Sequence, residues 1–299
     1  MLEPRRVLIY YHSLHRQAEY RAHAYSHYFL KQLPHHQVIL MASSASREHD
    51  LAQLRTAVDG IDEVLVVGGD GSVNLVTQVI ALRPIRLSII PCGTGNDFAR
   101  DLGITKWRWR MHNALQVGSV SIGKAGHEYF VNHAGSGLSS DLIALQPRWL
   151  KKSFGRLSYS LALCRYLFGP LSRRQPIYLN GRWYDCQIAA VSRFIGGGIA
   201  VNPQGSRQQQ QLQWLAVPRT TRWRQLRALW QLLLPRQDHC AELELQRNAC
   251  GQLGSADAHY ELDGDLRGVG PVQIECIPEG LTVVRPKVSH ELIEQGVSP

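Results

Sequence analysis

The sequence predicts two domains: an α/β domain with a doubly wound, mostly parallel sheet, and a mostly-β, sandwich-like domain after it. Three observations support this fold class. The chain has 299 residues, which exceeds the usual size of one domain. In its first part, short apolar runs alternate with helical stretches. In its second part, strand-like segments follow one another with turns between them.

The first part holds four apolar runs that are typical of buried strands, with three helical stretches between them. We expect strands at 6–11, 37–41, 64–67 and 87–90, and helices at 17–33, 48–58 and 74–82. Pro34 and Pro84 follow the first and third helices, where a proline ends a helix because it cannot continue the hydrogen-bond pattern. Strands that alternate with helices in this way form a parallel sheet.

The second part is rich in short strand-like segments. We expect strands at 117–122, 128–132, 176–179, 183–191, 211–217, 241–245, 260–262, 272–277 and 281–284, and helices at 151–168 and 221–234. We therefore place the first domain at 1–122 and the second at 123–284, and we expect residues 285–299 to return to the first domain.

The composition restricts the classes of protein that fit. Apolar residues make up 44% and charged residues 19%, which excludes a disordered chain. No apolar run approaches the roughly 18 residues of a membrane span. Six cysteines without a C-x-x-C pair indicate reduced thiols in a cytosolic protein. The net charge of +9 calls for an anionic partner, and since zinc-finger and RRM signatures are absent, nucleic acid is not favoured over a membrane surface or a phosphorylated ligand.

A glycine-rich turn follows the third predicted strand. It reads Gly68, Gly69, Asp70, Gly71, Ser72, Val73, Asn74. Glycines let the backbone approach a ligand closely, and the amino end of the next helix offers free N–H groups and partial positive charge, which suit a phosphate. Asp70 can hold Mg²⁺, directly or through water. A tight strand–helix turn with a helix cap is the alternative, and the full string in this context favours the phosphate site.

A second glycine-rich turn follows the fourth predicted strand. It reads Pro91, Cys92, Gly93, Thr94, Gly95, Asn96, Asp97, Phe98, Ala99, Arg100. Because open α/β sheets bind ligands at the carboxyl ends of their strands, the two turns are expected to face one crevice. Thr94 and Asn96 can donate to phosphate oxygens. Asp97 either caps a helix or joins the water shell of the metal.

The string GGDGSVN followed by PCGTGNDFAR resembles the diacylglycerol kinase catalytic-domain family, which also contains bacterial soluble lipid kinases and sphingosine and ceramide kinases. The GGDG turn is shared with NAD kinases and 6-phosphofructokinases, whereas GTGNDFAR is specific to the lipid kinases. The resemblance covers nearly the whole chain. Further segments that resemble family motifs are FGRLSY at 154–159, the three glycines at 196–198, LDGD at 262–265 and the closing strand LTVVRP at 281–286.

The resemblance implies an ATP- and Mg²⁺-dependent lipid kinase that phosphorylates a hydroxyl of diacylglycerol or a related lipid. Residues 1–122 would then bind nucleotide and residues 123–284 the lipid. The implied ATP-binding residues are Ser44, Gly68, Gly69, Asp70, Gly71, Ser72, Asn74, Gly93, Thr94, Gly95 and Asn96. The implied catalytic residues are Asp263, as general base, and Asp70. The implied metal ligands are Asp70, Asp97 and Asp265.

The resemblance also implies a cytoplasmic enzyme that contacts the inner face of the membrane transiently and binds no nucleic acid. Bacterial members are often dimers, so a homodimer is among the assemblies it implies. Two basic, aromatic segments are candidates for the membrane contact: residues 148–156, at the start of an expected lipid entrance over 151–168, and residues 221–234. For the second segment, packing on the sheet of its own domain with snorkelling arginines is the alternative.

The chain departs from the family pattern at three places. The first loop, Tyr11 to Arg16, lacks the family's glycines, and Ser139 stands where the family has an aspartate. Residues 209–213 carry glutamines where the family binds a structural Mg²⁺, so we expect that structural site to be absent.

These departures leave the activity open between two readings. One is an active kinase of a divergent branch, and the other is a catalytically weak regulator that binds lipid or nucleotide. We favour the active kinase, because the acids and amides of the two turns and of the LDGD segment are retained: Asp70, Thr94, Asn96, Asp97 and Asp263. A NAD-kinase-like enzyme is a further alternative, against which the GTGND turn argues.

Overall fold

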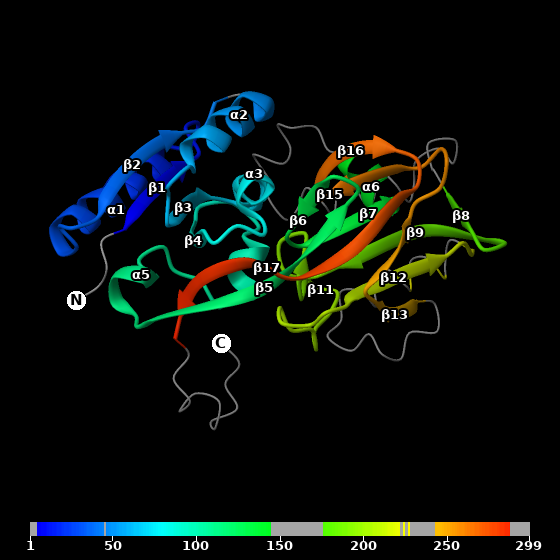
Figure 1. Cartoon of the computed structure of the whole chain (residues 1–299). Helices are drawn as coiled ribbons and strands as arrows, with labels where there is room; N and C mark the ends of the chain where they lie inside the picture. The colour runs from blue at the N-terminus through cyan, green and yellow to red at the C-terminus, as the bar shows by residue number, and fades with distance from the viewer. Residues whose placement is uncertain are drawn as a thin grey trace, which may run out of the picture. The chain divides into compact units, whose positions relative to one another are not determined.

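The computed structural model describes residues 5–44, 46–144, 176–221, 224, 227 and 243–287. The chain forms two compact units, Met1–Val120 with Glu279–Pro299, and Ser121–Pro278 (Figure 1). The boundaries expected from the sequence were 122/123 and 284/285. The helix expected at 151–168 and the motif at 154–159 lie outside the described residues. So does the segment at 221–234, apart from Thr221, Arg224 and Arg227.

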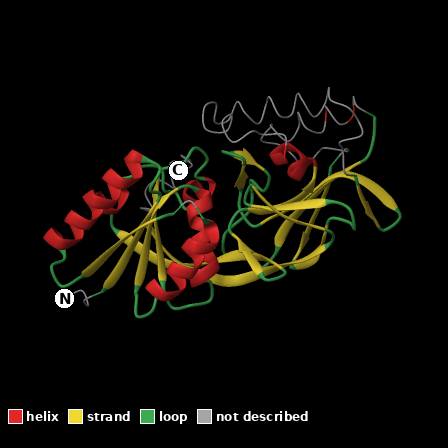
Figure 2. Cartoon of the chain, turned by 90° about the horizontal axis from the view of Figure 1, so that it is seen from above, coloured by secondary structure: helices red, strands yellow, loops and turns green. Residues whose placement is uncertain are grey.

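The N-terminal unit is built on a parallel sheet in the order β2-β1-β3-β4, continued by part of β17 next to β4 and then by part of β5. Its strands are β1 (Arg6–Tyr11), β2 (Gln37–Ala42), β3 (Glu63–Gly68), β4 (Arg86–Pro91), β5 (Leu115–Ala125) and β17 (Val272–Pro286). Its helices are α1 (Arg16–Gln32), α2 (Arg47–Ala57), α3 (Asp70–Ile80), α4 (Asp97–Asp101) and α5 (Trp109–His112). Figure 2 shows helices on both faces of this sheet, which confirms the doubly wound α/β class.

The core of this unit lies where the two central strands are covered on both faces. β3 is buried along its whole length, and four consecutive residues of β1, from Val7 to Tyr10, are buried as well. On the helix side, Tyr25 and Phe29 of α1 are fully buried, and the Tyr25 hydroxyl donates to the backbone oxygen of Trp107 at 2.7 Å. Continuous apolar strands are the expected pattern for a parallel sheet with helices on each face.

The register of the sheet places the loops that follow β1 to β4 at one edge. Tyr11 pairs with Ala42 and with Val67, and Gly68 pairs with Pro91. Because the strands are parallel, each pairing joins the last residues of one strand to the last residues of its neighbour. The glycine-rich turns after β3 and β4 are therefore neighbours.

Helix α3 begins earlier than the sequence predicts. We expected its start at Asn74, but the helix runs from Asp70, with Gly69 as the N-cap, whose carbonyl oxygen accepts the N–H of Ser72 at 3.0 Å. Glycine is a weak helix former, so the sequence pattern did not predict the first turn of this helix. An acidic side chain in the first turn favours the helix because it interacts with the positive end of the helix dipole.

The second unit is mostly antiparallel β-structure. Its larger sheet has the order β13-β12-β9-β7-β15-β16, with β8 beside β9. The elements are β6 (Glu128–Phe130), β7 (His133–Gly137), α6 (Leu138–Ala144), β8 (Ile177–Leu179), β9 (Arg182–Ala190), β10 (Phe194–Ile195), β11 (Ile199–Ala200), β12 (Leu212–Pro218), β13 (Glu244–Asn248), β14 (Cys250–Leu253), β15 (His259–Leu262) and β16 (Asp265–Val269). Three glycines at 196–198, all with positive φ, turn the chain between β10 and β11.

The strand predictions in this unit were wrong at one place, and five strands were not predicted: β7, β10, β11, β14 and β16. The segments 272–277 and 281–284 form one strand, β17, rather than two. Strand β7 was not predicted, because its sequence, HAGSG, contains no β-branched or aromatic residue. It is nevertheless buried at all five positions, since it lies between β9 and β15.

Candidate active site

The two glycine-rich turns of the N-terminal unit are in direct contact. A Cβ atom built on Gly93 would lie 2.7 Å from the Cα of Gly69, and one built on Gly69 would lie 3.0 Å from the Cα of Gly93. The N–H of Cys92 donates to the carbonyl oxygen of Gly68 at 2.9 Å. Only glycine allows two backbones to approach this closely, which explains the residue type at both positions.

The carboxylate of Asp70 joins the two turns. Its Oδ2 accepts the N–H of Asp97 at 3.1 Å and its Oδ1 accepts the N–H of Phe98 at 3.0 Å. Asp70 therefore caps the amino end of α4 while it belongs to the first turn of α3. Hydrogen bonds from backbone N–H groups to an ionised carboxylate are stronger than neutral ones, so this contact fixes the relative position of both turns.

The side chain of Asn96 holds the second turn closed. Its Oδ1 accepts the N–H of Gly93 at 2.9 Å and its Nδ2 donates to the carbonyl oxygen of Gly93 at 2.6 Å. Asn96 has φ of 51°, in the left-handed region that asparagine tolerates better than most residues. Thr94, at the tip of this turn, is exposed, and Gly95 is half-buried.

In the first turn, a Cβ atom would have room at Gly71 but not at Gly68. A Cβ built on Gly68 would lie 2.5 Å from Oγ of Ser72, because α3 begins directly over Gly68. A Cβ built on Gly71 would meet no atom within 4 Å. Gly71 is exposed at the amino end of an eleven-residue helix, the type of position at which a phosphate binds.

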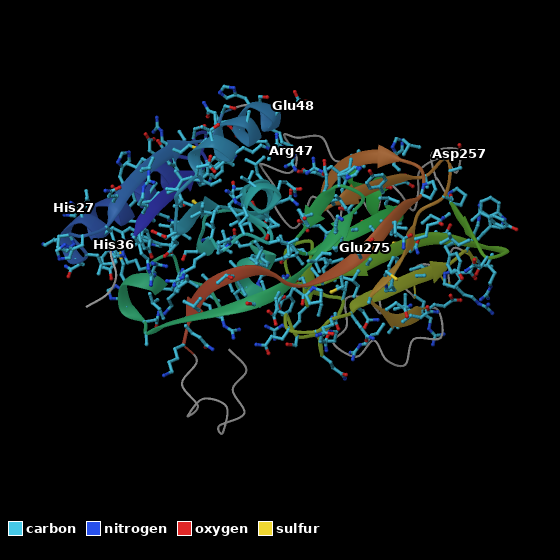
Figure 3. The ribbon with its side chains drawn as sticks, viewed as in Figure 1. His27, His36, Arg47, Glu48, Asp257 and Glu275 are labelled. Atoms are coloured by element: carbon cyan, nitrogen blue, oxygen red, sulfur yellow. The ribbon has the colours of Figure 1, made fainter. Side chains whose placement is uncertain are left out.

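Two of the residues expected to bind nucleotide are engaged within the protein. Asn74 is buried, and its Oδ1 accepts a hydrogen bond from Arg47 at 3.2 Å. Arg47 is the first residue of α2 and is labelled in Figure 3. The Ser44 hydroxyl donates to the carbonyl oxygen of Ser46, and the N–H of Ser44 donates to the buried Asp50. Both residues thus stabilise the loops around the two turns. Their role in nucleotide binding stays a prediction.

Residues from the loop after β1 also reach this edge. The N–H of His12 donates to the carbonyl oxygen of Val67 at 3.2 Å, and the Nδ1 of His15 lies 3.7 Å from the Sγ of Cys92. The loop after β1 is therefore placed beside both turns, with His15 next to the second turn.

The expected metal ligands have different surroundings. Asp97 is buried and forms an ion pair with Arg100 at 2.7 Å. Asp265, in the second unit, is exposed and lies 3.4 Å from Arg267. In the part of the chain that the structure describes, no group of three or more His, Cys, Asp or Glu side chains is placed to hold a metal ion. A Mg²⁺ bound with a nucleotide needs only one or two carboxylates, because phosphates and water supply its other ligands. Asp70 fits that requirement.

In the second unit, Asp263 lies in the turn between β15 and β16. Its carboxylate accepts three backbone N–H groups, from Val131 at 2.8 Å, Asn132 at 2.7 Å and His133 at 3.1 Å. Its own N–H donates to the carbonyl oxygen of His133 at 2.9 Å, and its φ is 51°. The turn is thereby attached to the start of β7 and presents a half-buried carboxylate in a fixed orientation.

A buried acid beside this turn was missed by the sequence reasoning. Glu261 is fully buried, and its Oε1 lies 3.0 Å from Nε2 of His133 and accepts the Ser139 hydroxyl at 2.7 Å. Its Oε2 accepts the N–H of Gly264 at 2.8 Å. Ser139 stands where the family pattern has an aspartate. In the structure, Glu261 of β15 supplies a carboxylate next to this position. The departure at Ser139 was the signal that could have prompted the search for it.

The ion pair with His133 favours the ionised form of the Glu261 carboxyl. Burial raises the pKa of the Glu261 carboxyl, but the attraction of His133 and the hydrogen bonds from His133, Ser139 and Gly264 outweigh burial, so the pKa lies below its ordinary value. Gly135 makes room for the group, since a Cβ there would lie 2.4 Å from both Oε1 of Glu261 and Oγ of Ser139.

Comparison with known proteins shows which family the first part of the chain is similar to. Residues 7–124 match the diacylglycerol kinase catalytic domain. This part of the chain is therefore similar to the catalytic domain of that family, and the chain has homologues among bacterial diacylglycerol kinases and lipid kinases. A family relative, the diacylglycerol kinase of Mycobacterium tuberculosis strain H37Rv, is 26% identical over 284 residues, which cover 88% of this chain and 90% of the relative. The diacylglycerol kinase of Bacillus subtilis strain 168 is 24% identical over 266 residues, covering 85% and 87%.

A solved structure of the family has the same fold. The crystal structure of a diacylglycerol kinase from Bacillus anthracis strain Sterne superimposes with a TM-score of 0.67 at 16% identity, covering 95% of this chain and 98% of that chain. The likeness in fold therefore extends over both units of the chain. Within the described residues, no helix combines the length and the apolar character that a membrane span requires.

Proposed function

We propose that the protein is an ATP-dependent lipid kinase that transfers the γ-phosphoryl group to a hydroxyl of diacylglycerol or a related lipid. The observation that carries this proposal is the contact between the two glycine-rich turns, with Asp70 bonded across them. Phosphoryl transfer needs positioning and charge stabilisation more than covalent chemistry from the protein, and two rigid turns at one sheet edge supply positioning.

In this proposal the N-terminal unit orients the triphosphate. The exposed end of α3 at Gly71, and Thr94 at the tip of the second turn, donate to phosphate oxygens. Asp70 holds Mg²⁺, with or without Asp97 of the second turn. When bound, Mg²⁺ neutralises the charge on the phosphates. The rigid contact between Gly69 and Gly93 keeps the two sets of donors at a constant distance from each other.

Asp263 is proposed to accept the proton of the lipid hydroxyl. A general base must keep its carboxylate in one orientation, and three backbone N–H groups hold the Asp263 carboxylate in place. Glu261 supports the same turn through Gly264 and, by its ion pair, through His133. We propose that Glu261 is a positioning residue for Asp263. Its carboxylate stands in for the one that is missing at Ser139.

A lipid- or nucleotide-binding regulator is the second candidate. The observation that favours it is that several polar groups expected to act on the ligand are engaged inside the protein, namely Asn74, Asn96 and Asp97. Such a protein would bind ATP or lipid and transfer no phosphoryl group.

One assay separates the candidates. The purified protein is incubated with ³²P-labelled ATP, Mg²⁺ and either diacylglycerol micelles, a panel of lipid extracts or NAD. Label in the organic phase supports the lipid kinase, label on NAD indicates a NAD-kinase-like enzyme, and label on neither, with ATP binding retained in calorimetry, indicates the regulator. D263N should lose turnover and keep ATP binding. If D263N melts at the wild-type temperature and still turns over at the wild-type rate, the role assigned to Asp263 is wrong.

A further inference from the structure

A cavity of about 480 Å³ lies in the N-terminal unit beside the second glycine-rich turn. It is lined by Arg21, Pro91, Asn96, Thr105, Lys106, Trp107 and Arg108. Pro91 and Asn96 belong to the turn, whereas Arg21 comes from α1 and the other four form the segment between α4 and α5. Apart from Asn96, none of these residues has a role in the nucleotide site proposed above.

The charges that line this cavity are all positive. Lys106 and Arg108 are exposed, and within the described residues neither side chain forms an ion pair or a hydrogen bond. Arg21 is held in place, because it donates to the carbonyl oxygen of Pro91 at 2.6 Å and to Oε1 of Gln17 at 3.3 Å. Three cations without a lining carboxylate create a local positive potential, which attracts an anion.

The side-chain donors of the lining suit a phosphate ester. Arginine and lysine are the residues that proteins use for phosphate, and Thr105 and Asn96 add a hydroxyl and an amide. The volume exceeds that of an inorganic phosphate and falls in the range of small-ligand pockets. A phosphate ester that carries a short polar alcohol therefore fits the lining better than phosphate alone.

Aromatic side chains border the same cations. The guanidinium groups of Arg21 and Arg108 lie 5.6 and 4.7 Å from the ring centroid of Trp107. The ring of Tyr20, which is 63% exposed, meets Trp107 edge-on at 6.2 Å. Tryptophan and tyrosine next to basic side chains are typical of protein surfaces at a membrane interface, where the rings lie at the level of the headgroups.

We propose that this cavity binds the phosphate ester of a glycerophospholipid headgroup, at a site that adjoins the nucleotide site and shares only Asn96 with it. The two exposed cations, Lys106 and Arg108, contact the phosphate, and Tyr20 with Trp107 lies against the bilayer surface. Since Asn96 lines the cavity and also closes the second glycine-rich turn, an occupied headgroup site stabilises that turn. Free glycerol 3-phosphate carries the same phosphate ester and is the other ligand that this cavity would accept.

The test compares two double variants with equal loss of charge. K106A/R108A removes the two exposed cations of the cavity. K31A/R55A removes two cations of α1 and α2 that are also exposed and form no ion pair within the described residues, and neither lines the cavity. Full-length proteins are sedimented with vesicles of phosphatidylcholine alone or mixed with phosphatidylglycerol, at constant ionic strength. No ATP or diacylglycerol is present, so the outcome does not depend on the proposed kinase activity.

We expect wild type and K31A/R55A to bind the phosphatidylglycerol vesicles, and K106A/R108A to bind them at least about tenfold more weakly, because each basic residue near an anionic surface contributes on the order of 1 kcal/mol. The variant K106R/R108K should restore binding. Equal losses in both alanine variants would mean that only the net charge matters, and no loss in K106A/R108A would mean that the cavity is not involved. Either result overturns the proposal.

A second arm identifies the source of the phosphate ester. Glycerol 3-phosphate is titrated into the same proteins by calorimetry, without vesicles. Heat of binding for wild type and K31A/R55A that is lost in K106A/R108A shows that the cavity recognises the free ester as well as the headgroup. Absence of heat together with the vesicle difference assigns recognition to the headgroup in a bilayer. Glycerol 3-phosphate binding that K106A/R108A retains overturns the assignment to this cavity.

Discussion

The carboxylate of Asp70, in the first turn of α3, accepts the backbone N–H of Asp97, which begins α4. The two residues follow neighbouring strands of the parallel sheet, and the hydrogen bond joins the two turns that carry the family's motifs. Asp70 is therefore structural as well as a candidate metal ligand, and the two roles can be separated by measuring stability and ligand binding on the same variant.

We predict that D70N destabilises the protein and abolishes turnover. The amide keeps one acceptor oxygen but turns an N–H group toward a backbone donor, so the free energy of unfolding should fall by about 1–3 kcal/mol. Urea unfolding and the labelled-ATP assay measure the two effects. D59N is the control, since Asp59 is highly exposed and only pairs with Arg83 at the surface. D70N with wild-type stability would show that the bridge between the turns contributes nothing.

Replacing two glycines of the turns by alanine should change the stability of the protein in opposite directions, while both replacements weaken ATP binding. G93A places a Cβ against the backbone of Gly69 and should lower both stability and ATP affinity. G71A meets no atom, and because alanine favours a helix over glycine, it should raise stability by about 0.5–1 kcal/mol while it weakens ATP binding. Calorimetric titration with MgATP and thermal melting measure both. Unchanged ATP affinity in G71A would exclude the phosphate position assigned to the end of α3.

The buried ion pair of Glu261 should be visible as an acid-dependent stability. E261Q leaves His133 without its carboxylate partner and should cost about 3–5 kcal/mol at pH 7. S139A removes one hydrogen bond and should cost about 1 kcal/mol. In lipid-kinase assays, E261Q should lower the turnover number more than it changes the KM for ATP, because its effect is on the turn that carries Asp263.

The pH dependence follows from the sign of the shift. The pKa of Glu261 is lower in the folded protein than its ordinary value of 4.5, so its stabilisation is complete above that value and is lost as the pH falls below it through the folded-state pKa. The difference in unfolding free energy between wild type and E261Q should therefore shrink as the pH falls below 4.5. The same series with S139A, which retains the carboxylate, should keep its acid dependence. A wild-type minus E261Q difference that stays constant with pH would contradict the assignment.

The cysteines should differ in reactivity in the folded protein. Burial raises the pKa of the Cys186 thiol to about 12, whereas Cys250 is exposed. The thiolate is the reactive form, so an alkylating reagent at pH 8 should label Cys250 first and Cys186 only on unfolding. Peptide mapping by mass spectrometry with and without urea distinguishes them. Equal labelling of the two thiols in the absence of urea would show that the sheet around Cys186 opens readily.

Much of the N-terminal unit is encoded locally, so its elements could be predicted. The strand–helix alternation and the positions of Pro34 and Pro84 depend on neighbours in the sequence, and the predicted strands coincide with β1 to β4 to within one residue at each end. Both glycine-rich turns could be placed at strand ends for the same reason. The start of α3 could not, because the stabilisation of a Gly-Asp-Gly turn as helix depends on the second turn, 27 residues away, which Asp70 caps.

The sequence by itself determined the alternation of strands and helices in the N-terminal unit, the two glycine-rich turns and the family to which they are similar. Only the tertiary structure decided which polar groups those turns present and which they use internally. Asn74 is held by Arg47 of another helix, and Ser139 lies beside Glu261 from a strand 122 residues further along the chain. Local periodicity specifies an element, whereas the partner of a buried charge depends on which strands become neighbours, and that is fixed only when the whole sheet has assembled.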